Sequence, residues 1–309
     1  MSQKVSKNKS QIFFPPCEVC KGADLKHLFA CKAPVHLNVF QYQFDVIKCL
    51  TCGFVSARTD QDLRAAKKIY DESFFNTSQQ SITENINSTW PEDAKKHAAY
   101  RNAVHRIKEI RLWKNAGTLL DIGCGKGIFV HAASRYFDAE GIDVSDYAVA
   151  EGRRFGLKLT SGDFREIDFD HHIFDVITMW DVLACFPQPL DIFQKVYNIL
   201  SPGGLFVFTF PSASSAAFRL LGKRWPMMIP PINVSFYTRK SIFILADKGR
   251  FQILRFGYPG KWVESGFLRL KLARSLGIKK SPALKKSGPL SRPLHINLLD
   301  IATVFLMKK

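Results

Sequence analysis

Residues Leu119 to Gly127 read Leu-Leu-Asp-Ile-Gly-Cys-Gly-Lys-Gly, and this stretch decides the fold. Its apolar residues predict a buried strand, and its three alternate glycines predict a tight turn where a ligand can approach the main chain closely. Residues Ile128 to Tyr136 can continue as a helix, so the turn also presents a helix N-terminus. A strand, a glycine turn and a helix are typical of many nucleotide-binding sites, so this stretch alone does not select one ligand.

Strand-like and helix-like segments alternate from residue 117 to the end of the chain. Buried strands are expected at 118–122, 139–143, 157–160, 174–180, 205–210, 251–256 and 300–307. Near-continuous apolar strands indicate burial on both faces. The sequence therefore predicts an α/β fold with a parallel sheet that is covered by helices on both faces.

Acidic residues lie at or just after the carboxyl ends of four of these strands, which is where an open parallel sheet binds its ligands. They are Asp121, Asp143, Asp163 and Asp181. A carboxylate in the place of Asp143 can accept hydrogen bonds from both hydroxyls of an adenosine ribose, although capping of the next helix is an alternative role. The Gly-x-Gly-x-Gly spacing differs from the Gly-x-Gly-x-x-Gly turn of dinucleotide binders and disfavours an NAD site.

Two Cys-x-x-Cys pairs precede this region. Cys17 and Cys20 form the first pair, Cys49 and Cys52 form the second, and Gly53 follows directly. Two such knuckles can place four thiolates tetrahedrally around Zn²⁺. The spacing predicts a zinc ribbon, with redox-active or unmetallated thiols as the alternative. Because a filled four-cysteine site has no open coordination position, we expect a structural zinc.

Composition divides the chain into four segments. We expect a disordered tail at 1–11, the zinc ribbon at 12–60, a helical linker or lid at 61–114 and the large α/β domain at 115–309, with a basic insertion at about 260–297. No run of 18 apolar residues is present and no apolar signal-peptide core follows the polar N-terminus, so we expect a cytoplasmic protein.

The positive charge is concentrated in the C-terminal third. From Ser214 onward the chain holds 19 of its 44 Lys and Arg residues but only three of its 27 Asp and Glu residues. Such a surface favours an anionic partner, which can be a phosphorylated substrate, nucleic acid or the inner face of an anionic membrane. A solvated basic surface without a partner is the alternative.

The ordered set of motifs resembles class I S-adenosylmethionine-dependent methyltransferases. After the glycine turn come Gly141-Ile-Asp-Val-Ser145, Gly162-Asp-Phe164, Phe174-Asp-Val-Ile-Thr-Met-Trp-Asp181 and Leu200-Ser-Pro-Gly-Gly204, in the family's order. The resemblance covers about residues 95–309 and implies a Rossmann-like seven-stranded methyltransferase sheet. The cysteine ribbon and the following Tyr70-Asp-Glu-Ser-Phe-Phe75 are similar to a bacterial-type subfamily that acts on small molecules, including sugars and lipid-linked intermediates.

The resemblance also implies the contacts to S-adenosylmethionine. Asp121, Gly123, Gly125 and Gly127 would surround its methionine part. Asp143 would bind the ribose, Val144 and Phe164 would pack on the adenine, and Asp163 would hydrogen-bond to it. Trp180 and Asp181 would lie near the sulfonium and the acceptor.

The chain departs from the family where a catalytic base is expected. Many relatives carry Glu-His where this chain has Val182-Leu-Ala-Cys-Phe186, and a histidine at or near the position of Asn233. Methyl transfer needs a base only when the acceptor is a weak acid, because the sulfonium is already activated. Asp181, Tyr237 and His295 are the remaining candidates.

We therefore expect a methyltransferase that uses S-adenosylmethionine and a structural Zn²⁺, and whose acceptor is a small molecule, a sugar or a lipid-linked compound, with an anionic acceptor favoured. An RNA methyltransferase is the first alternative, although no Asn-Pro-Pro-Tyr motif follows the fourth strand and no paired catalytic cysteines are evident. A non-catalytic module that binds S-adenosylmethionine is the second alternative.

Overall fold

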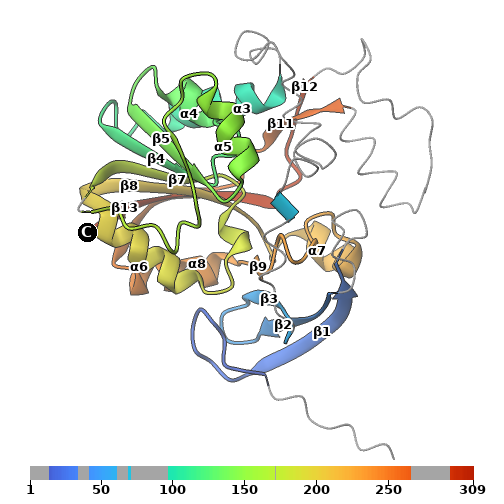
Figure 1. Cartoon of the computed structure of the whole chain (residues 1–309). Helices are drawn as coiled ribbons and strands as arrows, with labels where there is room; N and C mark the ends of the chain where they lie inside the picture. The colour runs from blue at the N-terminus through green and yellow to red at the C-terminus, as the bar shows by residue number, and fades with distance from the viewer. Residues whose placement is uncertain (1–13, 34–41, 61–68, 71–96, 171, 266–292) are drawn as a thin grey trace, which may run out of the picture.

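The computed structural model describes residues 14–33, 42–60, 69–70, 97–170, 172–265 and 293–309. The expected tail at 1–11, most of the expected linker and the central part of the basic insertion lie outside these residues. The described chain forms two main sheets, with the larger sheet sandwiched between helices (Figure 1).

The larger sheet has seven strands in the order β10-β13-β8-β7-β4-β5-β6. Their bounds are β4 Thr118–Ile122, β5 Asp138–Asp143, β6 Leu159–Ser161, β7 Phe174–Met179, β8 Leu200–Pro211, β10 Phe251–Gly257 and β13 Ile301–Lys308. Apolar runs with two buried faces explain why these segments are strands, and the expected strand 118–122 coincides with β4.

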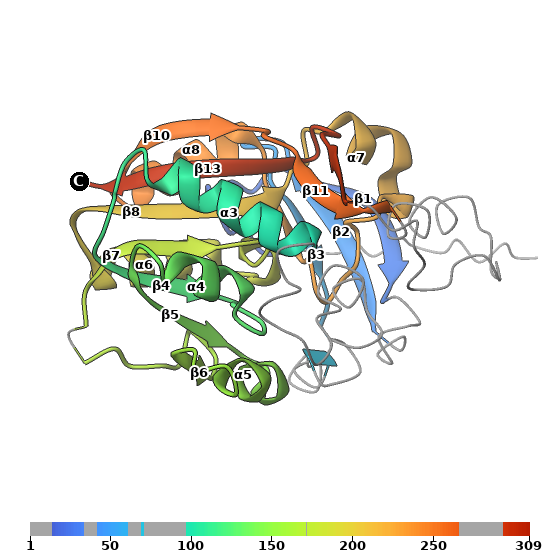
Figure 2. The same cartoon turned by 90° about the horizontal axis from the view of Figure 1, so that it is seen from above.

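The sheet is mixed, so the expectation of a parallel sheet is wrong for its last strand. Strand β13 pairs antiparallel with both β8 and β10. Between β10 and β13 the chain forms the antiparallel pair β11 (Lys261–Glu264) and β12 (Pro293–Ile296) beyond the sheet edge. The chain re-enters the sheet at the end where β10 leaves it, so β13 runs antiparallel to β10. A parallel strand would need a crossover that returns the chain to the opposite end of the strands. Figure 2 shows β13 between β8 and β10.

Helices cover both faces of this sheet, as expected. Helices α3 (Ala98–Ile110), α4 (Ile128–Ala133) and α5 (Asp146–Arg153) lie on one face, and α6 (Pro189–Ile199) and α8 (Arg239–Lys248) lie on the other (Figure 1). Because side chains alternate along a strand, Leu119 packs in the core with α3 and α4, and Leu120 packs in the core with α6 and α8.

The smaller sheet is antiparallel, with the order β1-β2-β3-β9. Its strands are β1 Leu25–Lys32, β2 Gln43–Cys49, β3 Val55–Arg58 and β9 Ser235–Phe236. Strand β9 lies outside the predicted ribbon boundary of 12–60, and the next residue, Tyr237, bridges to Ser212 after β8. The segment 235–237 therefore joins the two sheets, and Phe218 of α7 (Ala216–Leu221) packs in the core of the smaller sheet. Among the described helices, none combines the length and the apolar character that a membrane span requires.

Candidate active site

The glycine turn after β4 adopts a backbone that other residues avoid. Gly123, Gly125 and Gly127 all have positive φ, at 76°, 55° and 84°. A Cβ atom on Gly123 would lie 2.2 Å from a methyl carbon of Val182. The turn is closed by the main-chain N–H groups of Gly123 and Cys124, which donate to the carbonyl of Ile142 at 2.7 and 3.0 Å. The sequence folds this way because only glycine tolerates both the backbone angles and the close packing.

Asp143 ties the end of β5 to this turn. Its carboxylate accepts hydrogen bonds from the N–H of Gly125 at 2.8 Å and from the N–H of Ser145 at 2.9 Å. Burial raises the pKa of Asp143, and these N–H donors oppose that rise. Ser145, not Asp143, caps helix α5 through its hydroxyl oxygen. The geometry holds the carboxylate in place and leaves it lone pairs for ligand hydroxyls.

Asp163 is occupied by a neighbour that the sequence did not single out. The guanidinium of Arg165 donates to both carboxylate oxygens of Asp163, at 3.0 and 2.5 Å. Asp163 and Phe164 are buried, whereas the Val144 side chain is 42% exposed. Val144, Asp163, Phe164 and Arg165 all line one cavity. The first three, which the family resemblance assigned to the adenine, therefore lie together. An Arg two residues after an acid is the signal that reasoning from the sequence missed.

Trp180 and Asp181 follow β7 and line the same cavity. Asp181 has a φ of 61°, and its N–H donates to the hydroxyl oxygen of Thr209 at 2.7 Å. The Asp181 carboxylate lies 3.7 Å from both Arg106 and Lys261. The Arg106 guanidinium carbon stacks 4.3 Å from the Trp180 ring centre. Two cations therefore face the carboxylate at the end of the fourth strand.

Asp121 differs from the other three strand-end acids because it does not line the cavity. Its side chain is 2% exposed and accepts a hydrogen bond of 2.6 Å from the Thr178 hydroxyl. Burial raises its pKa from 3.8 to about 7, against the opposing effects of Thr178 and the charge of Arg106. The placement of Asp121 next to the methionine part of S-adenosylmethionine stays a prediction.

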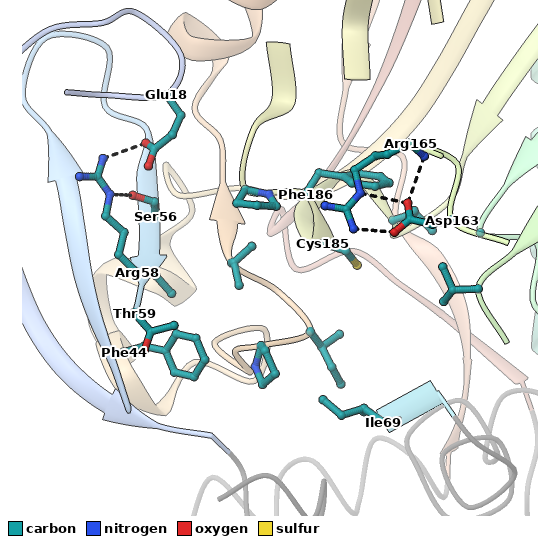
Figure 3. Close-up of a pocket in the computed structure, with 18 of the residues that line it drawn as sticks. Glu18, Phe44, Ser56, Arg58, Thr59, Ile69, Asp163, Arg165, Cys185 and Phe186 are labelled. Atoms are coloured by element: carbon teal, nitrogen blue, oxygen red, sulfur yellow. Dashed lines mark hydrogen bonds and ion pairs between the residues drawn. The ribbon is translucent and has the colours of Figure 1, made fainter. Parts of the chain in front are cut away.

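The cavity at the carboxyl ends of the strands has a volume of about 1240 Å³ and extends to the smaller sheet. On the side of the large sheet it is lined by Gly123, Asp143 and Trp180, and on the other side by β2 and β3. Figure 3 shows Arg165, Asp163, Cys185 and Phe186 on one side and Glu18, Ser56, Arg58 and Phe44 on the other. Pockets of roughly 300–1,000 Å³ hold one drug-sized ligand, so the volume of this cavity exceeds what one such ligand needs.

The wall formed by the smaller sheet contains an ion pair that sequence reasoning missed. Arg58 donates to Glu18 at 2.8 Å, to the Ser56 hydroxyl at 2.9 Å and to the carbonyl of Pro15 at 2.6 Å. Burial raises the pKa of Glu18, and the charge of Arg58 opposes that shift. Alternation along β3 puts Ser56 and Arg58 on one face, but no local pattern reveals Glu18 as their partner.

The three candidate bases are not brought together. Tyr237 is fully buried, and its hydroxyl donates to the carbonyl of Leu183 at 3.1 Å. His295 lies exposed on β12 against Trp262, with ring centres 5.3 Å apart. Of the three, only Asp181 lines the large cavity. Burial raises the pKa of the Cys185 thiol to about 12, so this cavity residue stays protonated at neutral pH.

The four cysteines of the two Cys-x-x-Cys pairs converge, with all their sulfur atoms within 4.8 Å of one another. Cys17 and Cys52 have their sulfurs 3.7 Å apart, and Cys20 and Cys49 have theirs 3.5 Å apart. A tetrahedron with Zn–S bonds of about 2.3 Å has S···S edges of about 3.8 Å. The donor set and its spacing are thus compatible with a zinc ion.

The fold and the glycine turn define the chain as a class I, Rossmann-like methyltransferase that uses S-adenosylmethionine. Residues 93–253 match the family model described as a methyltransferase domain, and the chain belongs to that family. The YcgJ protein of Bacillus subtilis has a similar fold, with a TM-score of 0.50 and 14% identity, over 68% of this chain and 99% of that one.

Two curated relatives are also methyltransferases. The ubiquinone biosynthesis O-methyltransferase of Coxiella burnetii is 26% identical over 197 residues, which are 60% of this chain and 76% of the relative. The sterol 24-C-methyltransferase of Candida albicans is 28% identical over 98 residues, which are 28% of this chain and 26% of the relative. These relatives methylate different atoms, so they do not define the acceptor of this chain.

Proposed function

We propose that this protein transfers a methyl group from S-adenosylmethionine to a small-molecule acceptor that lies between the two sheets. The single observation behind the proposal is the 1240 Å³ cavity, which joins the glycine turn and Asp143 to the wall formed by β2 and β3. The acceptor wall combines apolar residues such as Phe44 with the Arg58–Glu18 pair. These features suit a compact organic molecule with a few polar groups, such as a sugar or a lipid-linked compound.

The residues of the cavity mainly position the methyl donor and the acceptor, and contribute less acid–base chemistry. When bound, S-adenosylmethionine supplies an electrophilic methyl group on a sulfonium. Gly123 lets the ligand approach the main chain, and Asp143 offers acceptors to ribose hydroxyls. Asp181 can accept the proton of a hydroxyl acceptor, since its side chain is 45% exposed in the cavity. Holding the nucleophile in line with the methyl group supplies most of the remaining rate.

The cysteine cluster holds the smaller sheet against the larger one in this proposal. Three side chains of the α8 region donate to carbonyls of the knuckles: Thr238 to Cys52 at 2.7 Å, Lys240 to Thr51 at 2.6 Å and Lys248 to Val19 at 2.9 Å. Zn²⁺ bound by Cys17, Cys20, Cys49 and Cys52 would fix the knuckles that receive these bonds. The metal would then act structurally and position the acceptor wall.

The test follows a labelled methyl group. The protein is incubated with S-adenosylmethionine carrying a labelled methyl group and with separate metabolite, lipid and total-RNA fractions, and the labelled products are identified by mass spectrometry. We expect label in a small molecule or lipid. Label in RNA alone contradicts the proposal, and binding of S-adenosylmethionine without transfer to any fraction favours a non-catalytic module.

A pair of variants controls this experiment. Asp143→Ala is expected to weaken S-adenosylmethionine binding roughly 10- to 100-fold, because a hydrogen bond to a charged group contributes about 1.5–3 kcal/mol. Asp146→Ala removes a carboxylate three residues away that is exposed and bonded to Ser161, so calorimetry is expected to show unchanged binding. Equal losses in the two variants argue against a ribose role for Asp143.

A further inference from the structure

A second, smaller cavity lies against the other side of the active site. Its volume is about 210 Å³, and Trp180 lines both cavities. Its walls are helix α3, the segment 255–261 and the ends of β8 and β13 that lie at the carboxyl edge of the sheet. A ligand group in this cavity therefore lies next to the place where the methyl group is transferred.

Helix α3 contributes a polar stripe to this cavity. Asn102, His105, Arg106 and Glu109 are spaced at i, i+3, i+4 and i+7, and all four line it. The apolar face of the same helix, which includes Ile107, packs on the sheet. A polar stripe on a surface helix normally faces water, but here the segment 255–261 covers it.

The cover is fixed to the helix by hydrogen bonds. The side-chain amide of Asn102 donates to the carbonyl of Trp262 at 2.8 Å and accepts from the N–H of Trp262 at 2.8 Å. Glu264 accepts a hydrogen bond of 2.9 Å from the N–H of Ala98 at the start of the helix. These bonds hold β11 on α3 and thereby place Lys261 opposite Arg106.

The charges in this cavity are incompletely matched. Arg255 pairs with Glu109, whereas Arg106 and Lys261 share the Asp181 carboxylate at 3.7 Å each. The Arg106 side chain is 23% exposed, and no hydrogen bond joins its guanidinium to the described part of the chain. The guanidinium nitrogens of Arg106 reach the solvent of the cavity, so their N–H donors are available to an oxygen-rich anion.

Two further side chains offer hydrogen bonds to such a ligand. The indole N–H of Trp180 is buried and has no partner among the described residues. Burial lowers the pKa of His105, so that its imidazole is neutral at neutral pH and can donate or accept.

The two cavities differ in the charge that they favour. Among the described residues, six carboxylates and two arginines line the large cavity, which suits the cationic methyl donor: Glu18, Asp45, Asp60, Asp143, Asp163, Asp181, Arg58 and Arg165. At about 210 Å³ the small cavity is below the roughly 300 Å³ of a pocket for a whole drug-sized ligand, so it fits one group of a molecule.

We propose that the cavity between α3 and the segment 255–261 binds the carboxylate or phosphate group of the methyl acceptor, through Arg106 and Lys261. This inference rests on the proposed methyltransferase function. The acceptor then extends from this anionic group, past Trp180, into the large cavity. The substrate class is a small organic acid or phosphate ester.

Inorganic phosphate is the probe for this site. It is titrated by calorimetry, at constant ionic strength, into the full-length protein saturated with S-adenosylhomocysteine, so that the carboxylate of the donor's methionine part is already in place. We expect saturable binding that Arg106→Met and Lys261→Met each weaken about tenfold or more. The matched control is Arg101→Met, which removes a charge from the same helix outside the cavity, where Arg101 stacks on Trp262. We expect this control to bind phosphate like the parent protein.

Thermal melting and the affinity for S-adenosylhomocysteine show whether each variant is folded. Lys261→Met keeps the test valid if Arg106→Met does not fold, because the Lys261 side chain is 33% exposed at the rim. Three results overturn the inference: no saturable phosphate binding, an equal loss in Arg101→Met, or phosphate binding that occurs in the free protein but not in protein saturated with S-adenosylhomocysteine. A protein that never binds S-adenosylhomocysteine contradicts the proposed function instead, and titration of the free protein then still tests the cavity.

Discussion

The buried carboxylate of Asp121 leads to a pH dependence of stability that Asp121→Asn should remove. The side chain is 2% exposed, and its pKa rises from 3.8 to about 7 because burial penalises the charged form. The Thr178 hydroxyl can donate equally well to an asparagine oxygen, so the variant keeps the 2.6 Å hydrogen bond. Asparagine has the same shape but cannot ionise, which isolates the cost of the charge.

The direction follows from proton linkage. The unfolded chain loses the Asp121 proton near pH 3.8, and the folded chain keeps it until about pH 7. The free energy of unfolding therefore falls as the pH rises between these values and levels off above pH 7. The complete shift corresponds to about 4 kcal/mol, at about 1.4 kcal/mol per pKa unit. Between pH 5.5 and 8 the linkage relation gives a loss of about 2 kcal/mol from this group.

The measurement is urea unfolding followed by circular dichroism at pH 5.5 and pH 8. We expect Asp121→Asn to gain about 2 kcal/mol relative to the parent protein over this interval. The matched control is Asp138→Asn, whose carboxylate is 64% exposed beside Lys158 and should leave the pH dependence unchanged. A parent protein and an Asp121→Asn variant with parallel pH dependence refute the reasoning, because they show that the charge of Arg106 already offsets the cost of burial.

Two further predictions concern the glycine turn and the cysteine cluster. Gly123→Ala should lower the melting temperature and abolish calorimetric binding of S-adenosylhomocysteine, because the new Cβ would lie 2.2 Å from Val182. The control is Gly203→Ala, which has a φ of 67° and open space around it. This control should show only the backbone cost of about 1–2 kcal/mol. Equal losses of stability and of binding in the two variants contradict the explanation by the contact with Val182. Chelation or Cys52→Ser should remove one equivalent of zinc, as measured by mass spectrometry, and should speed hydrogen exchange in β1–β3, while S-adenosylhomocysteine still binds. The control Cys31→Ser lies outside the cluster and should change neither the zinc content nor the exchange. Zinc-free parent protein with a protected smaller sheet contradicts this role.

Local sequence patterns were sufficient to locate the strands of the large sheet, but not to give the direction of β13. The apolar run ending at Ile122 and the glycines after it predicted β4 and its turn, because burial on two faces and positive φ are demands on single residues. The four strand-end acids were equally visible. Three of them, Asp143, Asp163 and Asp181, do line one cavity.

Long-range pairings were not visible in the same way. Strand β9 has two residues, Ser235 and Phe236, and is a strand only because β3 lies beside it. The direction of β13 depends on the path of the chain through β11 and β12, and not on its own apolar pattern. Burial of Asp121 and the pairing of Glu18 with Arg58 likewise depend on neighbours that the packing supplies.

The sequence by itself determined the class of the fold, the glycine turn and the cysteine pairs, because each depends on residue types at short, fixed spacings. Only the tertiary structure decided what surrounds these elements. It placed the wall of β2 and β3 opposite Asp143, and it stacked Arg106 on Trp180, where Arg106 shares the Asp181 carboxylate with Lys261. Charge and apolar periodicity are properties of the chain, but a cavity and an incompletely paired cation exist only after distant segments have packed together.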